Sequence, residues 1–246
     1  MGWAATSRFD QMGGQNGVAE RLEILEQVIA EPPVVHPDAP NGSAWRTSRR
    51  CYEFLAQEVG PGSRTLETGA GLSTVLFCGW GCLHTAVVPD PREADAITSY
   101  LSDHDFSTES LTFDLRPSEE ALPALAGNGQ LDLMLIDGAH SFPAPIIDWF
   151  YGACRLARGG IAVFDDVPLP AVSSFLDSYL DRDDRWERIA GTRKWRAYRR
   201  LSEGTLAEHE SNQRFFVGPR PPVGQRVLGR VGSLMPRRVR KLILPQ

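Results

Sequence analysis

The stretch 131–166 constrains the fold more than any other part of the chain. It contains two short apolar runs, Leu131–Ile136 and Ile161–Phe164, separated by one segment of helical length, Phe142–Ala157, which a Gly-Gly pair closes. A short apolar run, a helix and a second apolar run are typical of a βαβ unit, in which parallel strands are covered on both faces. The sequence therefore predicts an α/β protein with a doubly wound, mostly parallel sheet.

Both apolar runs end in acidic residues. Asp137 follows the first run, and Asp165 and Asp166 follow the second. Neighbouring parallel strands place their carboxyl ends on the same edge of a sheet, which is where ligands bind in open α/β folds. We therefore expect these three acids to converge on a ligand site. His140 follows Asp137 closely and is expected at the same edge.

Periodic patterns on either side of this unit predict the remaining elements. Further strands are expected at Arg64–Thr68, His84–Val88 and Leu111–Leu115, with a closing antiparallel hairpin at Trp186–Gly191 and Arg193–Leu201. Helices are expected at Gly17–Ala30, Ser48–Val59 and Ala171–Leu180, and after each of the first three strands. The proline-rich segment Glu31–Ser43 is expected to be a linker.

The 246 residues suffice for one large α/β domain. We expect an N-terminal helical cap and linker over residues 1–60, an α/β domain over 61–202 and a basic tail over 203–246. The first helix would pack on the domain or on a partner subunit, which leaves a homo-oligomer open. Trp45, Arg46 and Ser48 are candidates for the border of the ligand site, with a structural role as the alternative.

A glycine turn follows the first predicted strand, with the sequence Glu-Thr-Gly-Ala-Gly-Leu-Ser-Thr from Glu67 to Thr74. Gly69 and Gly71 permit a tight turn that a ligand can approach closely. The start of the next helix offers unpaired amide groups to an anionic group. Thr74 stands where a GxGxxG motif has its third glycine, which disfavours NAD or FAD.

The glycine turn resembles motif I of the class I S-adenosylmethionine (SAM)-dependent methyltransferases, and further landmarks of that family follow in order between residues 48 and 201. They are Asp90 after the second strand, Ser118-Glu119 after the third, LIDGAH at the fourth and GGIAVFDD at the fifth. The resemblance implies a seven-stranded Rossmann-like sheet preceded by helices. It also implies a SAM site formed by Glu67, Thr68, Gly69, Gly71, Ser73, Asp90, Ser118, Glu119 and Asp137.

One position departs from that family. An acid usually ends the second strand there and holds the ribose hydroxyls, whereas this chain has Val88 at that position. We expect Asp90, slightly later in the chain, to take the ribose role. The alternative is that SAM binding is altered, as in a degenerate methyltransferase fold that serves only as a binding protein.

Three carboxylates at one edge either raise one another's pKa or hold a cation. Oxygen ligands suit a hard divalent ion, with Mg²⁺ first and Ca²⁺ or Mn²⁺ next. The layout is similar to the metal site of catechol-type O-methyltransferases, and closer to that of sugar O-methyltransferases of the macrocin and mycinamicin type. The resemblance implies a metal held by Asp137, Asp165 and Asp166, and catalysis by His140 as general base together with Asp137.

The expected reaction is therefore methyl transfer from SAM to a hydroxyl of a sugar, glycan or other small-molecule acceptor. A hydroxyl is a poor acid, so it needs both the metal and the base more than an amine would. Two alternatives stay open: a metal-independent small-molecule methyltransferase in which the acids cap helices, and a structural role for His140. Asp148 is expected to be solvated or paired in a salt bridge.

The end of the chain is basic. From Arg214 onward it holds eight basic residues and no acidic one, mixed with apolar positions. Such a tail can suit an anionic membrane surface, although packing on the acidic domain is favoured. No basic stripe marks the α/β part, so nucleic acid is not expected as a partner. Without a signal peptide or a long apolar run, the protein is expected to be cytoplasmic, with no transmembrane segment.

Overall fold

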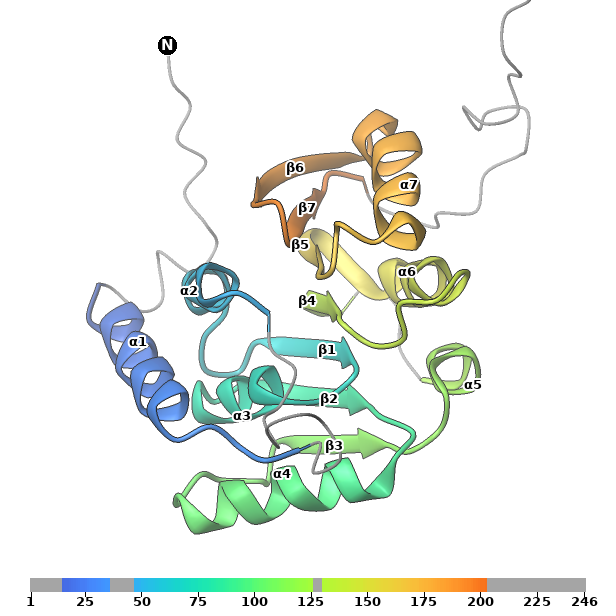
Figure 1. Cartoon of the computed structure of the whole chain (residues 1–246). Coiled ribbons are helices and arrows are strands. Elements are labelled where there is room, and N and C mark those ends of the chain that lie inside the picture. Colours follow the sequence, from blue (N-terminus) through green and yellow to red (C-terminus); the bar gives the residue numbers. More distant parts are fainter. Residues whose placement is uncertain (1–14, 36–46, 126–129, 203–246) are drawn as a thin grey trace, which may run out of the picture. The chain divides into compact units, whose positions relative to one another are not determined.

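A computed structural model describes residues 15–35, 47–125 and 130–202 of the chain (Figure 1). All the described elements belong to one structural unit, Met1–Leu206. The predicted basic tail, as well as Trp45 and Arg46, lies outside the described residues.

The sheet has seven strands in the order β3-β2-β1-β4-β5-β7-β6 (Figure 1). In chain order they are β1 (Arg64–Thr68), β2 (Leu83–Val87), β3 (Leu111–Asp114), β4 (Leu131–Ile136), β5 (Leu156–Phe164), β6 (Trp186–Gly191) and β7 (Arg196–Arg200). The first five are parallel, and β7 runs antiparallel to both β5 and β6. The predicted fold class, a doubly wound and mostly parallel seven-stranded sheet, is confirmed.

Helices cover both faces of this sheet. They are α1 (Gln15–Ala30), α2 (Arg49–Glu58), α3 (Leu72–Gly79), α4 (Pro91–Asp103), α5 (Ser118–Ala124), α6 (Ala144–Gly152) and α7 (Pro170–Ser178). The helices form two layers, each with its own hydrophobic cluster against the sheet. Helices α1 to α4 pack on one face of the sheet, and α5 to α7 pack on the other (Figure 1). The central strand β4 supplies Leu133 and Leu135 to the first cluster and Met134 and Ile136 to the second. This double burial explains its unbroken apolar run.

The fifth strand is longer than the sequence pattern predicts. β5 begins at Leu156, before the Gly-Gly pair, whereas the predicted strand begins at Ile161. The pairing with β4 shifts register near its start, and Gly159 takes a φ of +86°, which an L side chain rarely adopts. The preceding helix is shorter than predicted, because α6 ends at Gly152 and a 3-10 turn leads into the strand. The glycine pair is therefore part of a bulged strand.

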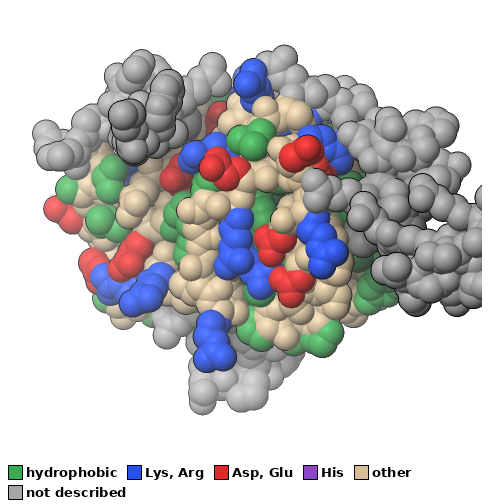
Figure 2. Space-filling view, turned by 90° about the horizontal axis from the view of Figure 1, so that it is seen from above, with side chains coloured by type: hydrophobic (Ala, Val, Ile, Leu, Met, Phe, Trp, Pro, Cys, Tyr) green, Lys and Arg blue, Asp and Glu red, His purple; other side chains and the backbone are tan. Residues whose placement is uncertain are grey.

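The other predicted elements shift by a few residues at their ends. Ser48 precedes α2 as predicted, but its hydroxyl makes no capping hydrogen bond. No helix in the described ranges combines the length and apolar character needed to cross a membrane. On the face seen in Figure 2, acidic and basic side chains are interspersed among the described residues. Elsewhere in the structure, Asp177 on α7 forms an ion pair with Arg196 on β7.

Candidate active site

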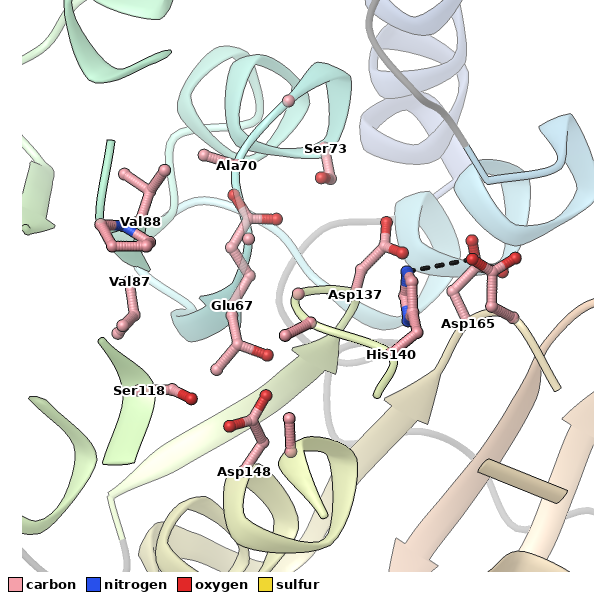
Figure 3. A pocket seen from close by; sticks show the side chains of 18 of the residues that line it. Glu67, Ala70, Ser73, Val87, Val88, Ser118, Asp137, His140, Asp148 and Asp165 are labelled. Atoms are coloured by element: carbon pink, nitrogen blue, oxygen red, sulfur yellow. Dashed lines mark ion pairs between the residues drawn. The ribbon is translucent and has the colours of Figure 1, made fainter. Parts of the chain in front are cut away.

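A cavity of about 880 Å³ lies at the carboxyl ends of β1, β2, β4 and β5 (Figure 3). The strand order reverses between β1 and β4, which is where crevices form in doubly wound sheets. The cavity brings together nearly all the predicted site residues, namely Glu67, Thr68, Gly69, Gly71, Ser73, Ser118, Glu119, Asp137, His140, Asp165 and Asp166. It is also lined by three charged residues that the sequence reasoning did not place there: Glu93, Asp148 and Lys194.

The glycine turn after β1 is held against the end of β4. Gly69 has a φ of +88°, and its amide donates to the carbonyl oxygen of Val87 at 2.9 Å. A Cβ on Gly69 would lie 2.6 Å from the carbonyl oxygen of Asp137. Gly69 is therefore required because the turn packs directly against the backbone at Asp137. This packing in turn fixes the shape of the cavity wall.

Glu67 lies below this turn and is fixed by a buried polar network. Its Oε1 accepts a hydrogen bond from the Thr74 hydroxyl and lies 3.0 Å from Nε2 of His84. Nδ1 of His84 is in turn 2.8 Å from the Thr65 hydroxyl, and its ring stacks on Phe77. Because Oε1 is engaged from two sides, the network fixes the orientation of the Glu67 carboxylate at the cavity wall.

Asp90, the residue expected at the ribose, follows β2 and lies at the start of α4. It is the N-cap of α4, and its carboxylate accepts from the Arg92 amide at 2.9 Å and pairs with the Arg92 guanidinium at 2.6 Å. It is not among the residues that line the cavity, whereas Val88 and Glu93 are. With Asp90 as N-cap and Pro91 at the first helical position, Glu93 is the third residue of the helix. An N-cap acid followed three residues later by Glu marks the start of a helix, and this sequence signal places Glu93 in the first turn of α4, next to the end of β2.

At the other end of the cavity, Asp137, His140 and Asp166 each offer one oxygen or nitrogen atom, and these three atoms lie within 4.8 Å of one another. Nε2 of His140 is 3.0 Å from Oδ2 of Asp166, the ion pair drawn as a dashed line in Figure 3. Burial raises the pKa of Asp137 well above its ordinary value, and the charges of Asp165, Glu67 and Asp166 raise it further. This end of the cavity therefore attracts a proton or a cation.

Of the three predicted metal ligands, Asp137 and Asp166 form a close group with His140, and Asp165 is not part of that group. Asp165 is buried, its Oδ1 accepts from the Thr47 hydroxyl at 2.7 Å, and its Oδ2 lies 3.5 Å from Nζ of Lys194. The same ammonium is 3.9 Å from Asp166. The structure thus adds a cation that the sequence reasoning did not place beside these acids. Lys194 arrives there because β7 pairs with β5, which puts the hairpin turn at the end of β5.

The atoms at this end fit a divalent cation. Two carboxylates from neighbouring strand ends supply the oxygen ligands that Mg²⁺ or Mn²⁺ prefers, while an imidazole better suits transition metals. Asp137 and Asp166 are the pair of carboxylates that can share such an ion, with His140 beside them.

Asp148 contradicts its expected solvated or salt-bridged role. It lies on α6 with a relative exposure of 1%, and it points into the cavity (Figure 3). Burial raises the pKa of Asp148, and hydrogen bonds from the hydroxyls of Ser118 and Thr68 act against that rise. The number of residues between Asp137 and Asp148 could not predict this position, because the residue at which α6 begins decides which of its side chains face the cavity.

Known proteins resemble this chain in one domain model and in fold. The family model described as a methyltransferase domain matches residues 66–167. No curated protein matches the chain in sequence. A Staphylococcus aureus structure, provisionally named a caffeoyl-CoA O-methyltransferase, has a TM-score of 0.56 and 10% identity, over 74% of this chain and 99% of that one.

Two further solved structures have a similar fold. The SAH-bound methyltransferase PaMTH1 from Podospora anserina has a TM-score of 0.54 and 16% identity, over 76% of this chain and 88% of that one. Cofactor-bound Rv0187 from MTB has a TM-score of 0.52 and 18% identity, over 80% of this chain and 94% of that one. At these identities the likeness concerns the fold. Residues 66–167 thus match the model of a methyltransferase domain, and the chain has the Rossmann-like fold of these solved methyltransferase structures.

Proposed function

We propose that this chain is a SAM-dependent O-methyltransferase that methylates a hydroxyl of a sugar, glycan or other small-molecule acceptor. The observation that carries the proposal is the composition of the cavity. A glycine turn at the switch point of the sheet lies at one part of it, and the group Asp137, His140 and Asp166 lies at another. The methyltransferase domain match over residues 66–167 supports the same reaction class.

The two ends of the cavity would serve the two reactants. The turn and the fixed carboxylate of Glu67 suit the methionine part of SAM, whose ammonium needs a hydrogen-bond acceptor. Glu93 lines the cavity at the end of β2 and is the carboxylate we assign to the ribose hydroxyls in place of Asp90. When bound, SAM supplies an electrophilic methyl group on a sulfonium, so the protein must mainly orient the acceptor and remove its proton.

His140 is the base in this proposal. With Asp166 3.0 Å from Nε2, a neutral imidazole that carries its proton on Nε2 leaves Nδ1 to accept the hydroxyl proton. Asp166 then stabilises the positive charge that the ring acquires. Asp137 and Asp166 would hold a divalent cation, which when bound lowers the pKa of a coordinated hydroxyl.

A metal-independent O-methyltransferase is the second candidate, and Lys194 is the observation that favours it. Its ammonium lies within 3.9 Å of both Asp165 and Asp166, so it offsets part of the negative charge without an added ion. In that case the same residues would bind and orient the acceptor hydroxyl by hydrogen bonds.

The experiment combines binding with turnover. S-adenosylhomocysteine (SAH) binding is measured by calorimetry, and methyl transfer from SAM is measured against a panel of sugars, glycosides and catechols. The protein is assayed as purified, after exhaustive chelation, and after return of Mg²⁺, Mn²⁺ or Ca²⁺. We expect SAH to bind and transfer to hydroxyls to depend on the returned ion. Full activity after chelation would select the metal-independent candidate, and failure to bind SAH or SAM would overturn the proposed function.

A further inference from the structure

Lys194 is the one lysine or arginine side chain among the described residues that line the cavity. Its ammonium lies 3.5 Å from Oδ2 of Asp165 and 3.9 Å from Oδ1 of Asp166. The second oxygen of each carboxylate has another neighbour. Oδ1 of Asp165 accepts from the Thr47 hydroxyl, and Oδ2 of Asp166 lies 3.0 Å from Nε2 of His140. The ammonium therefore bridges two acids beside the place where the proposed divalent ion would bind.

The backbone around Lys194 holds it at this edge of the sheet. Its carbonyl oxygen accepts from the Val167 amide at 2.8 Å, and its own amide donates to the Thr192 hydroxyl at 3.1 Å. The next residue, Trp195, is buried, and its ring centroid lies 5.1 Å from that of Phe54. A cation that is attached to so firmly packed a turn stays at a high local concentration beside the acids, whereas a free ion can diffuse away.

The charge of Lys194 acts on the third acid as well. Burial and the neighbouring acids raise the pKa of Asp137, and the charge of Lys194 acts against that rise. When Asp137, Asp165 and Asp166 are all ionised, they carry three negative charges, of which the ammonium offsets one. The two charges that remain equal the charge of one divalent ion.

We propose that Lys194 is a built-in cation that competes with the divalent ion for Asp166, so that it weakens ion binding and suits the site to a divalent rather than a trivalent ion. This inference rests on the proposed function, in which Asp137 and Asp166 hold the ion. Two positive charges a few Å apart repel each other, and the repulsion grows with the charge of the ion. In the ion-free protein the same ammonium reduces the repulsion between Asp165 and Asp166.

The test compares Mn²⁺ and Tb³⁺ binding in wild-type protein and in Lys194→Met, which removes the charge and keeps an unbranched side chain. Electron paramagnetic resonance measures Mn²⁺ binding, and luminescence measures Tb³⁺ binding, both after exhaustive chelation. Lys194→Met should bind Mn²⁺ at least about 10-fold more tightly than wild type does. A 10-fold gain for Mn²⁺ corresponds to about 30-fold for Tb³⁺, because the repulsion that is removed scales with the charge of the ion.

Arg193→Met is the matched control. Arg193 is exposed, lies beside Lys194 in the same turn, and is not among the residues that line the cavity. The variant makes the same change in net charge and should bind both ions as wild type does. Equal gains in Arg193→Met and Lys194→Met would reduce the effect to overall charge and overturn the inference.

The remaining outcomes also decide the question. Unchanged or weaker Mn²⁺ binding in Lys194→Met would show that Lys194 holds the acids in place for the ion, and a gain for Tb³⁺ no larger than that for Mn²⁺ would refute selection by charge. If Lys194→Met does not fold, Lys194→Gln is measured instead, with the same expected direction. If none of the proteins binds Mn²⁺, this inference fails, whereas SAH binding by calorimetry decides separately whether the proposed methyltransferase function holds.

Discussion

Nε2 of His140 lies 3.0 Å from Oδ2 of Asp166, although the two residues follow different strands. Asp166 adopts a φ of +49°, which is uncommon for a residue other than glycine. The conformation turns its carboxylate toward the loop after β4, where His140 lies. A strained backbone of this kind clusters at functional sites, and here it accompanies the pairing of an acid with the candidate base.

We predict that His140→Gln lowers kcat by about 10²–10⁴-fold, the usual contribution of a positioned base. Glutamine can keep a hydrogen bond to Asp166 but cannot take up the proton. SAH affinity should stay close to that of wild type, because the variant leaves the glycine turn intact. Single-turnover kinetics and SAH calorimetry measure the two effects. Near-native kcat in His140→Gln would show that another group removes the proton.

Asp137→Asn should weaken binding of a divalent cation as well as activity. The burial and neighbouring acids that raise the pKa of Asp137 are the features that make its site attractive to positive charge. Titration of the chelated protein with Mn²⁺, followed by electron paramagnetic resonance, measures ion binding without turnover. Asp132→Asn at the opposite end of β4 is the control and should bind Mn²⁺ as wild type does. Equal Mn²⁺ affinity in the two variants would argue against the assignment.

The network around Glu67 predicts a separate effect on cofactor binding. His84→Leu removes the group 3.0 Å from Oε1 of Glu67, so that this buried oxygen loses one of its two hydrogen bonds and keeps only that from the Thr74 hydroxyl. An unsatisfied buried group costs about 1–3 kcal/mol, so the free energy of unfolding should fall by that order. SAH affinity should fall in the folded variant as well, because the carboxylate is no longer fixed.

His104→Leu is the control for this experiment, since His104 stacks on Tyr100 at a distance from the cavity residues. It should leave SAH affinity unchanged. Urea unfolding and calorimetry measure stability and binding independently. A His84→Leu protein that is destabilised yet binds SAH normally would restrict His84 to a structural role.

Two glycines allow the backbone contact at the turn to be measured. Gly69 and Gly159 have nearly the same φ, +88° and +86°, but a Cβ meets Asp137 at 2.6 Å in the first case and nothing within 4 Å in the second. Alanine at either position adds the cost of a left-handed conformation, about 1–2 kcal/mol. Gly69→Ala should be clearly more destabilised than Gly159→Ala in thermal unfolding. Equal losses would mean that the turn can move away from Asp137 without cost.

The sequence was sufficient for the fold because each strand of the sheet carries its own pattern. The run Leu131–Ile136 is apolar throughout since β4 packs on helices at both faces, and parallel strands place Asp137 and Asp166 at one edge. The glycine turn was likewise recognisable from local residues. These features depend on neighbours in the chain or on the general rule for strand ends.

The remaining features depend on distant segments. Lys194 reaches the acids only because β7 inserts between β5 and β6, and Thr47 reaches Asp165 only because the start of α2 lies over the same edge. Asp148 was misplaced because α6 begins at Ala144, which fixes the face that each helix position presents. Spacing alone carries none of this information.

Asp148 also predicts how stability varies with pH in the ligand-free protein. Burial raises its pKa, as does the charge of Glu119, while the hydroxyls of Ser118 and Thr68 and the charge of His140 act in the opposite direction. The folded protein therefore binds this proton more tightly than the unfolded chain does. Its stabilising effect is complete below the unfolded pKa of about 3.9 and is lost as the pH rises through the higher folded pKa.

Asp148→Asn removes this titration while it keeps the size of the side chain. Below about pH 4 the variant and wild type should unfold at similar temperatures, because both then carry a neutral group at this position. As the pH rises, the variant should become the more stable of the two, by roughly 1.4 kcal/mol for each unit of upward pKa shift, and the difference should level off above the folded pKa. Differential scanning calorimetry across this range measures the difference. A stability difference that is independent of pH would mean that Asp148 ionises in the folded protein as easily as in the unfolded chain.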